Sequence, residues 1–276
     1  MSDTRMDGTE TSGNPKEEAG SATFRRRLLA GEPLVGTFVK TPAHDMVEVL
    51  MLSGLDFLCL DAEHAAFDRA RLDACLAVAV AHGFPVLVRV GSPEVQALQQ
   101  VLDAGASGVV VPHVDSVEKA SRIARRARFG HGGRGYAGST RWAGFTTRTM
   151  PELLARSAAE TVVIAQIEEP AGVEASEAIA AVDGIDALFA GPADLAVCYG
   201  ADALDAPPVR EAMRRSGEAA RRQGKAFVTF APDTRSLEAL RALGVSVFVI
   251  GSEHGFVLGG ARALVTSVHG ERHDRD

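Results

Sequence analysis

The sequence predicts an α/β protein folded as a single (β/α)8 barrel, the TIM barrel. Short apolar runs alternate with amphipathic stretches along the chain, and there are eight such runs. Each run is continuous rather than alternating in polarity, which is typical of parallel strands covered on both faces. The length of 276 residues suits one barrel of about 250 residues without a second domain.

The eight predicted strands are short and rich in β-branched residues. In chain order they are Leu34–Val39, Asp56–Leu60, Pro85–Val90, Gly108–Pro112, Val162–Ile167, Ala187–Ala190, Ala226–Phe230 and Val245–Ile250. A doubly wound open sheet is the alternative for alternating strands and helices. We rank it below the closed barrel, because eight strands alternating with helices are what the barrel requires.

Helix patterns occupy segments between these runs. The segment after the second run has one apolar face at i, i+3, i+4 spacing, formed by Leu72, Cys75, Leu76, Ala79 and Val80. The segment after the third run repeats the pattern with Val95, Leu98, Val101 and Leu102. A further helix opens with Asp115 and Glu118, which resemble a capping box, and continues through Ile123 and Ala127.

The two ends of the chain lack the barrel pattern. Residues 1–23 are polar, acidic and without an apolar segment, so we expect a disordered leader rather than a secretory signal. The first helix pattern is Phe24–Ala30, and the single barrel domain is expected over residues 24–270. The charged residues 271–276 are expected to be frayed.

Composition limits the partners and the compartment. The net charge of -7 argues against a general binder of nucleic acid or of an anionic membrane. No run approaches the roughly 18 apolar residues of a membrane span. The three cysteines include no CxxC pair, and we interpret Cys59 and Cys75 as buried packing residues, with Cys198 as the third. An odd cysteine count fits a reducing compartment, so we expect a cytoplasmic protein.

One irregular stretch, residues 129–149, interrupts the alternation between the fourth and fifth strands. It holds six glycines together with Arg134, Tyr136, Arg141, Trp142 and Arg148. A long loop inside a compact domain is more often functional than idle. We therefore expect this stretch to have a functional role.

Polar residues follow several predicted strands at their carboxyl ends, where barrel enzymes carry their chemistry. The second strand ends in Asp61-Ala62-Glu63-His64, and the third supplies Arg89. The fifth ends in Gln166-Ile167-Glu168, and the sixth in Gly191-Pro192-Ala193-Asp194. Each residue alone has a structural interpretation, as a helix cap or an ion-pair partner. Their convergence on one rim favours a catalytic site.

The residue types at this rim suit metal-assisted acid–base chemistry. Glu168 and Asp194 come from adjacent strand ends, which suits two carboxylates on one hard cation. Mg²⁺ and Mn²⁺ prefer oxygen ligands, and Mg²⁺ typically takes one or two protein carboxylates. Arg89 supplies a planar fork for a carboxylate or an enolate. His64 is of the residue type that titrates near neutrality, so it can move protons.

Patterns for other cofactors and nucleophiles are missing from the sequence. There is no GxxxxGK[ST] phosphate loop, and the glycine-rich residues 130–135 lead into no clear helix. A desolvated Schiff-base amine is expected inside an apolar run, and both Lys40 and Lys225 lie outside these runs. We therefore favour a metal-assisted enolate over an imine.

At these residues the chain resembles the HpcH/HpaI aldolases, class II pyruvate aldolases of the 4-hydroxy-2-oxoheptane-1,7-dioate aldolase type. The matching segments keep their order and spacing over about residues 25–268: Gly54–Phe57, Asp61–His64, Val88–Val90, Leu102–Gly105, Gly133–Gly135, Gln166–Glu168 and Gly191–Leu195. The resemblance implies a TIM barrel of the phosphoenolpyruvate/pyruvate-binding type. It also implies reversible cleavage of 4-hydroxy-2-oxo acids to pyruvate and an aldehyde, with Mg²⁺, Mn²⁺ or Co²⁺ as cofactor.

The resemblance also implies roles for individual residues. Glu168 and Asp194 resemble the two metal ligands. Arg89 resembles the arginine that holds pyruvate and its enolate, and His64 resembles the acid/base group for the aldol hydroxyl. Asp103 matches an aspartate that pairs with that histidine.

Further implications concern the substrate and the assembly. Gln166 resembles a group near the bound oxo acid, and the backbone of Gly191, Pro192 and Ala193 is expected against the substrate carboxylate. The resemblance implies a homo-oligomer, a hexamer, in which the last helix packs on a neighbour. The apolar stripe expected on that helix comprises Ala261, Leu264, Val265 and Val268.

Two segments depart from the type enzyme. Residues 135–142 differ in length and composition, and Gly251-Ser252-Glu253-His254-Gly255 carries a second acid–histidine pair after the eighth strand. We expect both to border the aldehyde side, which leaves the natural acceptor open. The alternatives are a related carbon–carbon bond enzyme, similar to siderophore-pathway citrate synthases or citryl-CoA lyases, and a non-catalytic oxo-acid-binding barrel.

Overall fold

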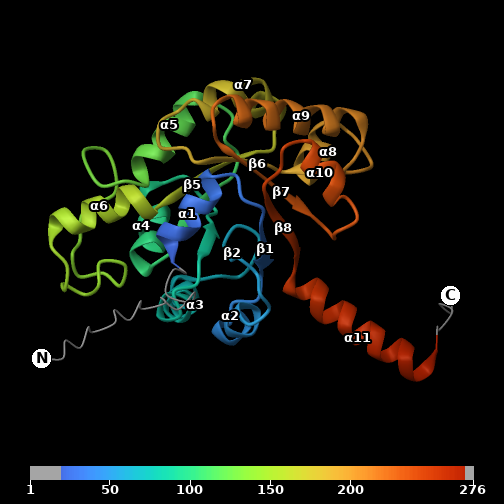
Figure 1. The fold of residues 1–276 in the computed structure, drawn as a ribbon, viewed down its shortest axis with the longest axis horizontal. Helices are drawn as coiled ribbons and strands as arrows, with labels where there is room; N and C mark the ends of the chain where they lie inside the picture. The colour runs from blue at the N-terminus through green and yellow to red at the C-terminus, as the bar shows by residue number, and fades with distance from the viewer. Residues whose placement is uncertain (1–19, 271–276) are drawn as a thin grey trace, which may run out of the picture.

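The computed structural model describes residues 20–270, in which eight parallel strands close into one barrel in chain order (Figure 1). The strands are β1 Leu34–Val39, β2 Phe57–Asp61, β3 Val86–Arg89, β4 Gly108–Val111, β5 Val162–Ile167, β6 Ala187–Ala190, β7 Ala226–Ala231 and β8 Val247–Ser252. β1 pairs with both β2 and β8. The predicted closed barrel is confirmed, and the open-sheet alternative is wrong.

Several strands begin or end one or two residues from their predicted limits, and the difference matters at β2 and β8. Both strands run past their apolar residues into polar ones. Asp61 at the end of β2 is the register partner of Arg89 in β3, and Ser252 in β8 is the partner of Phe38 in β1. Sheet pairing therefore also positions the polar strand ends.

Helices alternate with the strands, and most of them pack around the outside of the barrel (Figure 1). They are α1 Ser21–Leu29, α2 His44–Met51, α3 Arg69–Ala81, α4 Val95–Ala104, α5 Val117–Arg126, α6 Met150–Glu160, α7 Pro170–Ala180, α8 Pro192–Cys198, α9 Pro207–Arg222, α10 Leu237–Ala242 and α11 Glu253–His269. The helix patterns found between the second and fifth apolar runs correspond to α3, α4 and α5. Within residues 20–270, no helix is long and apolar enough to cross a membrane.

The first helix begins earlier than predicted. α1 starts at Ser21, whereas we placed the boundary between leader and barrel after residue 23. Ser21 Oγ lies 2.8 Å from Ser107 Oγ, which ties the start of the helix to the barrel. The rest of the predicted leader, residues 1–19, and the predicted frayed end, residues 271–276, lie outside the described residues.

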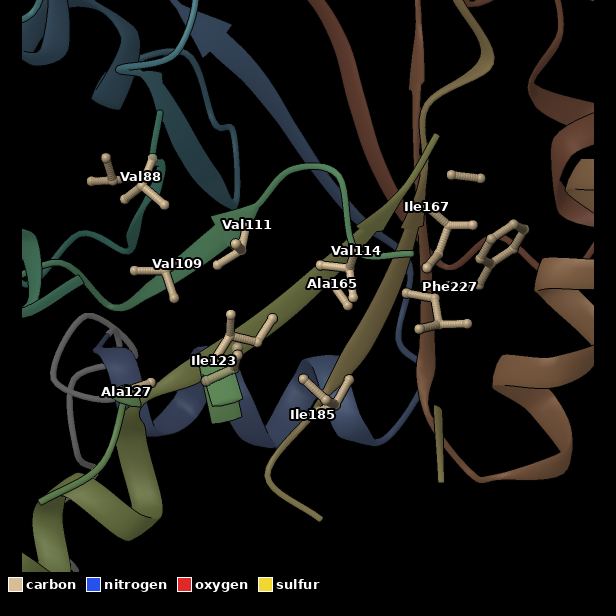
Figure 2. Close-up of a cluster of buried hydrophobic side chains, with 14 of the residues drawn as sticks. Val88, Val109, Val111, Val114, Ile123, Ala127, Ala165, Ile167, Ile185 and Phe227 are labelled. Carbon is tan, nitrogen blue, oxygen red and sulfur yellow. The ribbon is translucent and has the colours of Figure 1, made fainter. Parts of the chain in front are cut away.

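Side chains on the strands alternate between two buried layers. The outer layer lies between strands and helices, and Figure 2 shows part of it, including Val109, Val111, Ala165, Ile167 and Ile123. The inner layer fills the barrel and includes Phe38, Cys59, Leu87, Val110 and Ile164. α1 closes the amino-terminal end, where the rings of Phe24 and Phe57 lie 5.4 Å apart between centroids.

The inner layer continues into polar residues at the carboxyl ends of the strands. In an extended strand, residues two positions apart point to the same side. The inner residues Phe38, Cys59, Leu87 and Ile164 are followed two positions later by Lys40, Asp61, Arg89 and Gln166. The strand period alone therefore directs four polar side chains into one end of the barrel.

α11 differs from the other helices because almost none of its side chains are buried. Figure 1 shows it running away from the barrel. Glu253, its first residue, is its only buried residue. The exposed large apolar side chains on α11 are Phe256, Val257, Leu258, Leu264, Val265 and Val268. An exposed apolar face of this extent is typical of a protein–protein contact surface.

Candidate active site

A pocket of about 410 Å³ opens at the carboxyl ends of the strands. The predicted site residues that line it are His64, Arg89, Gln166, Gly191, Pro192, Ala193 and Asp194. Larger hollows, of about 470, 690 and 930 Å³, lie elsewhere on the surface. Size alone does not identify the site, and we assign it by the side chains that meet there.

Arg89 and Asp61 form a buried ion pair in this pocket. Nε and Nη2 of Arg89 donate to Oδ1 and Oδ2 of Asp61 at 3.0 and 2.8 Å. Burial opposes ionisation of Asp61, but the hydrogen bonds and charge of Arg89, together with Lys40, lower the pKa of Asp61 below its ordinary value. Nη1 of Arg89 takes no part in this pair, so it is available to a ligand in the pocket.

His64 lies at the mouth of the pocket with its side chain 58% exposed. Its backbone N–H donates to Asp61 Oδ1 at 3.2 Å, so the buried ion pair also holds the turn that follows β2. Its Nε2 lies 3.7 Å from Glu63 Oε2. The imidazole therefore faces both solvent and pocket, which suits proton transfer to and from a bound ligand.

Glu168 directly follows β5 and is almost completely buried. The backbone N–H of His113 donates to its Oε1 at 2.7 Å, and Nε2 of Gln166 donates to its Oε2. Burial, together with the nearby charge of Asp194, raises the pKa of Glu168 against the opposing influence of His113 and Gln166. Such a carboxylate gains stability when a cation binds it.

Asp194 lies in the first turn of α8 and approaches Glu168 across Gly191. A Cβ atom added at Gly191 would lie 3.3 Å from Glu168 Oε2 and 3.4 Å from Asp194 Oδ2, so both oxygens border one small space. Gln166 Oε1 is buried without a hydrogen-bond partner, and Gln166 Nε2 contacts Glu168 Oε2. Oxygen donors around one space are the set that a hard divalent cation prefers.

Within residues 20–270, no three His, Cys, Asp or Glu side chains converge into a metal cage. Glu168 and Asp194 therefore stand as a pair of carboxylates, with the amide of Gln166 beside them. Mg²⁺ commonly binds proteins through one or two carboxylates and keeps water or substrate oxygens in its other positions. The residues present fit such an ion.

His113, two residues after the end of β4, is a site residue that sequence reasoning missed. Its φ of 55° lies in the left-handed region that is uncommon outside glycine. Its Nδ1 lies 3.1 Å from Glu168 Oε1 and 2.9 Å from Glu169 Oε1, and its Nε2 lies 3.6 Å from Glu63 Oε1. Since Glu63 Oε2 lies 3.3 Å from Arg89 Nε, His113 connects the arginine side of the site to the carboxylate side. The sequence feature that could have identified His113 is its position directly after the predicted apolar run of the fourth strand.

Asp103 does not line the pocket. It lies near the end of α4, where its Oδ1 is 3.2 Å from Arg134 Nη2. Arg134 is itself buried, and its guanidinium lies 4.1 Å from the Phe129 ring centroid and 4.7 Å from that of Trp142. The expected pairing of Asp103 with His64 is therefore not made within one chain. The physical reason is that α4 packs outside the barrel, against a separate hollow.

The two segments expected to border the aldehyde side lie in different places. Gly251, Ser252 and Gly255 line the pocket, as expected. Residues 135–142 do not, and the expectation for them was wrong. Arg141 faces the hollow beside α3 and α4, because two hydrogen bonds at 2.5 and 3.1 Å tie it to an aspartate of α3.

Glu253 and His254, the second acid–histidine pair, join α11 to the barrel. Glu253 Oε1 accepts hydrogen bonds from the backbone N–H groups of Lys40 at 2.8 Å and Thr41 at 2.5 Å. His254 Nε2 lies 3.0 Å from Thr41 Oγ1. These contacts fasten the start of α11 to the end of β1, beside the pocket.

Comparisons with known proteins indicate one family. The family model for HpcH/HpaI aldolase/citrate lyase matches residues 34–258. A hydroxypyruvate/pyruvate aldolase of Paraburkholderia phytofirmans is 34% identical over 255 residues, which covers 89% of this chain and 96% of that protein. A 4-hydroxy-2-oxovalerate aldolase of Novosphingobium aromaticivorans is 37% identical over 182 residues, covering 64% and 68%. The crystal structure of an HpcH/HpaI aldolase/citrate lyase family protein from Burkholderia cenocepacia has a TM-score of 0.84 at 32% identity, covering 90% and 99%.

Proposed function

This chain belongs to the HpcH/HpaI aldolase/citrate lyase family, and we propose that it is a pyruvate aldolase, a carbon–carbon lyase. The reaction is reversible cleavage of a 4-hydroxy-2-oxo acid into pyruvate and an aldehyde. The observation that carries the proposal is the rim of the barrel, where Arg89, His64 and Asp194 line one pocket and Glu168 lies against Asp194. Binding an oxo acid and transferring a hydroxyl proton require groups of these kinds.

Glu168 and Asp194 would hold a divalent metal ion, Mg²⁺, Mn²⁺ or Co²⁺. When bound, the ion supplies Lewis-acid polarisation of the oxo acid. The proposal is supported by the space that their oxygens share across Gly191, and by the unpartnered Oε1 of Gln166.

Arg89 would bind the oxo-acid end of the substrate. Asp61 already fixes two of its nitrogens, so Nη1 is held in place before the substrate arrives. A positive charge held in advance near the oxygen where negative charge develops is worth more in a closed pocket than in water. The backbone of residues 191–193 would lie against the substrate carboxylate, where the missing Cβ of Gly191 leaves room.

His64 would transfer the proton of the C4 hydroxyl. In cleavage it accepts this proton while the C3–C4 bond breaks, and the bonding electrons remain with the enolate of pyruvate. A proton from water then completes the methyl group. In condensation His64 returns a proton to the aldehyde oxygen as the new C–C bond forms. Its exposed position allows it to exchange that proton with solvent between turnovers.

The protein would act as a homo-oligomer, a hexamer, in which Asp103 serves a second copy of the chain. Asp103 lies away from His64 in its own chain, whereas the matching aspartate of the resembling family pairs with the histidine. The exposed apolar face of α11 would be covered in the same assembly. Truncation before Gly259 should give smaller or aggregated species, and an unaltered soluble hexamer on size-exclusion chromatography would refute this. The three free thiols fit a cytoplasmic location.

A condensation screen tests the proposed function. Purified protein is incubated with pyruvate, one of several divalent metals and a panel of aldehydes, and the 4-hydroxy-2-oxo acid product is quantified by mass spectrometry. We expect product with at least one aldehyde and none after chelation. Condensation of a different oxo acid only would indicate a related carbon–carbon bond enzyme. Pyruvate binding without turnover of any aldehyde would indicate a non-catalytic barrel.

A further inference from the structure

One of the larger hollows, of about 690 Å³, lies at the end of the barrel opposite the candidate active site. Its lining includes Asp186 and Lys225, which directly precede β6 and β7, and Arg25 of α1, the helix that closes the amino-terminal end. The proposed reaction takes place at the carboxyl ends of the strands and makes no use of this hollow. At the amino-terminal face of a barrel, the first interpretation of such residues is structural.

The hollow carries an excess of positive charge. Four cations and two carboxylates line it, which leaves two positive charges unbalanced: Arg25, Arg125, Arg128, Lys225, Asp183 and Asp186. The chain as a whole has a net charge of -7. A cleft lined by one sign of charge focuses the electric field and raises the local concentration of oppositely charged ligands. The hollow therefore attracts anions although the protein is acidic.

Asp186 is shared between two arginines of this hollow. Its Oδ1 accepts a hydrogen bond from Arg25 Nη2 at 2.7 Å, and its Oδ2 lies 3.7 Å from Arg128 Nη2. The backbone N–H of Val163 also donates to Oδ2, at 2.9 Å. One buried carboxylate, already hydrogen-bonded to the backbone, therefore faces two guanidinium charges.

Both guanidinium groups keep N–H donors without acceptors. Each has five such donors. Arg25 Nε and Arg128 Nη1 are buried and make no hydrogen bond. Arg25 Nη1 makes only a long contact, 3.5 Å, to the carbonyl oxygen of Ala159, and Arg128 Nη2 donates to that of Thr161 at 2.9 Å. Both side chains are 22% exposed, so part of each group remains accessible from the hollow.

The proximity of the two arginines is electrostatically unfavourable. Burial lowers the pKa of Arg128, Asp186 opposes this effect, and the like charge of Arg25 adds to it. The pKa of Arg128 therefore lies below its ordinary value. An additional anion in the hollow would offset both the burial and the repulsion, so its binding is favoured where the chain alone supplies too little negative charge.

The structural interpretation does not account for the other two cations. Asp186 fastens α1 to the barrel through Arg25, but Arg125 and Lys225 take no part in this. Among residues 20–270, neither of their side chains forms a hydrogen bond or an ion pair. The hollow is also left open between them, because Ala and Gly side chains supply much of the remaining lining: Ala124, Ala158, Gly184 and Gly224.

We propose that this hollow is a binding site for a small anion that carries a phosphate group. Arg125 and Lys225 contact the phosphate from the rim, and Arg25 and Arg128 from beside Asp186. The site is separate from the proposed aldolase site, and the inference does not rest on the proposed function.

The charge and the donor types favour a phosphate over a carboxylate. A phosphate group carries about two negative charges and several strong acceptor oxygens, which matches the two unbalanced positive charges. Arginine binds phosphate through parallel N–H donors, and lysine binds it as a point charge. A carboxylate would neutralise one charge and would offer two oxygens to four cations. The free ion and a phosphorylated metabolite share this chemistry.

The test is calorimetric titration of the full-length, Mg²⁺-loaded protein at pH 8 and constant ionic strength. Inorganic phosphate, glycerol 3-phosphate and acetate are the probes. Lys225→Met and Arg125→Gln should each raise the Kd of phosphate on the order of tenfold, because one charged donor is lost. Lys225→Arg should retain the affinity. Arg71→Gln, on the exposed surface of α3 and outside the hollow, is the control with the same change of net charge.

Each outcome bears on the proposal. Tighter binding of glycerol 3-phosphate than of phosphate would support it with a phosphorylated metabolite as ligand, and the reverse order would support it with the free ion. No binding of either probe, or equal affinity in the two hollow variants and Arg71→Gln, would overturn it. Acetate bound as tightly as phosphate would also overturn it. A loss of binding in Arg89→Ala alone would place the anion in the active-site pocket instead. Since Arg128→Met removes a half-buried charge and endangers the fold, the test rests on the two variants without intramolecular partners.

Discussion

Arg89 and Asp61 are register partners in adjacent strands, and their side chains meet in two hydrogen bonds of 3.0 and 2.8 Å. The strand pairing that closes the barrel thus also orients the guanidinium of the pocket. Because Asp61 is fully buried and Arg89 nearly so, each charge depends on the other for its stability in the interior.

Removing one charge of this pair should destabilise the protein. Asp61→Asn keeps the shape but leaves Arg89 buried without its full counter-charge, so the free energy of unfolding should fall by roughly 3–5 kcal/mol. Urea denaturation measures it. Asp73→Asn is the control, because Asp73 also pairs with an arginine, at 2.5 Å, but is 51% exposed. Its loss should cost less than about 1 kcal/mol. An equal loss of unfolding free energy in the two variants would contradict the conclusion that burial makes the Asp61–Arg89 pair matter more than an exposed pair.

The same variant should change the acid sensitivity of the protein. Arg89 holds the pKa of Asp61 below its ordinary value of 3.8 despite burial. The stabilisation is therefore complete above the unfolded-state pKa and is lost as the pH falls through the lower folded-state pKa. Wild type and Asp61→Asn should converge in stability as the pH falls below 3.8. A difference that stays constant down to strongly acidic pH would contradict the ionised state of Asp61.

Metal affinity should depend on two carboxylates. Glu168→Gln and Asp194→Asn keep the size but remove ligand charge, so each should weaken binding of Mn²⁺ or Mg²⁺ by more than the 10–100-fold typical of losing an outer-shell partner. Isothermal titration calorimetry measures the affinity, and circular dichroism checks that the fold survives. Glu174→Gln, on the exposed surface of α7, is the matched control. Unchanged affinity in both site variants would show that the ion binds elsewhere.

His64→Ala should separate the two halves of the reaction. The imidazole is assigned to the aldol hydroxyl, so condensation should fall by about 10²–10⁴, the usual contribution of a general acid or base. Deuterium exchange into pyruvate should fall much less. Parallel rate measurements of both reactions in one preparation check this. An equal loss of both would make His64 the base that enolises pyruvate.

The barrel could be predicted because its signal is local. β1, β5 and β6 begin and end at the residues where their apolar runs begin and end. The inward direction of Asp61 and Arg89 follows from the two-residue period of a strand. The pocket residues of strands two, three, five and six could be placed for the same reason. The carboxyl ends of all the strands lie together at one end of a barrel, even when their residues lie far apart in the chain.

What could not be predicted depends on side-chain contacts between elements. The position of His113 in the site depends on its left-handed backbone conformation after β4. No residue type in that segment predicts this conformation. Glu253 turned out to anchor the backbone of Lys40, and only the folded position of α11 shows this. Asp103 was assigned to His64 by resemblance, but a single barrel places it with Arg134 on the outside.

The central claim is tested most directly by pyruvate alone. If Arg89 and the metal site stabilise an enolate, the methyl protons of pyruvate should exchange with deuterium in D₂O without any aldehyde, as followed by proton NMR. Exchange should vanish with a chelator and fall on the order of 10²–10³ in Arg89→Ala, because one well-placed electrostatic group is lost. Metal-loaded wild-type protein that binds pyruvate but never accelerates exchange would contradict the account.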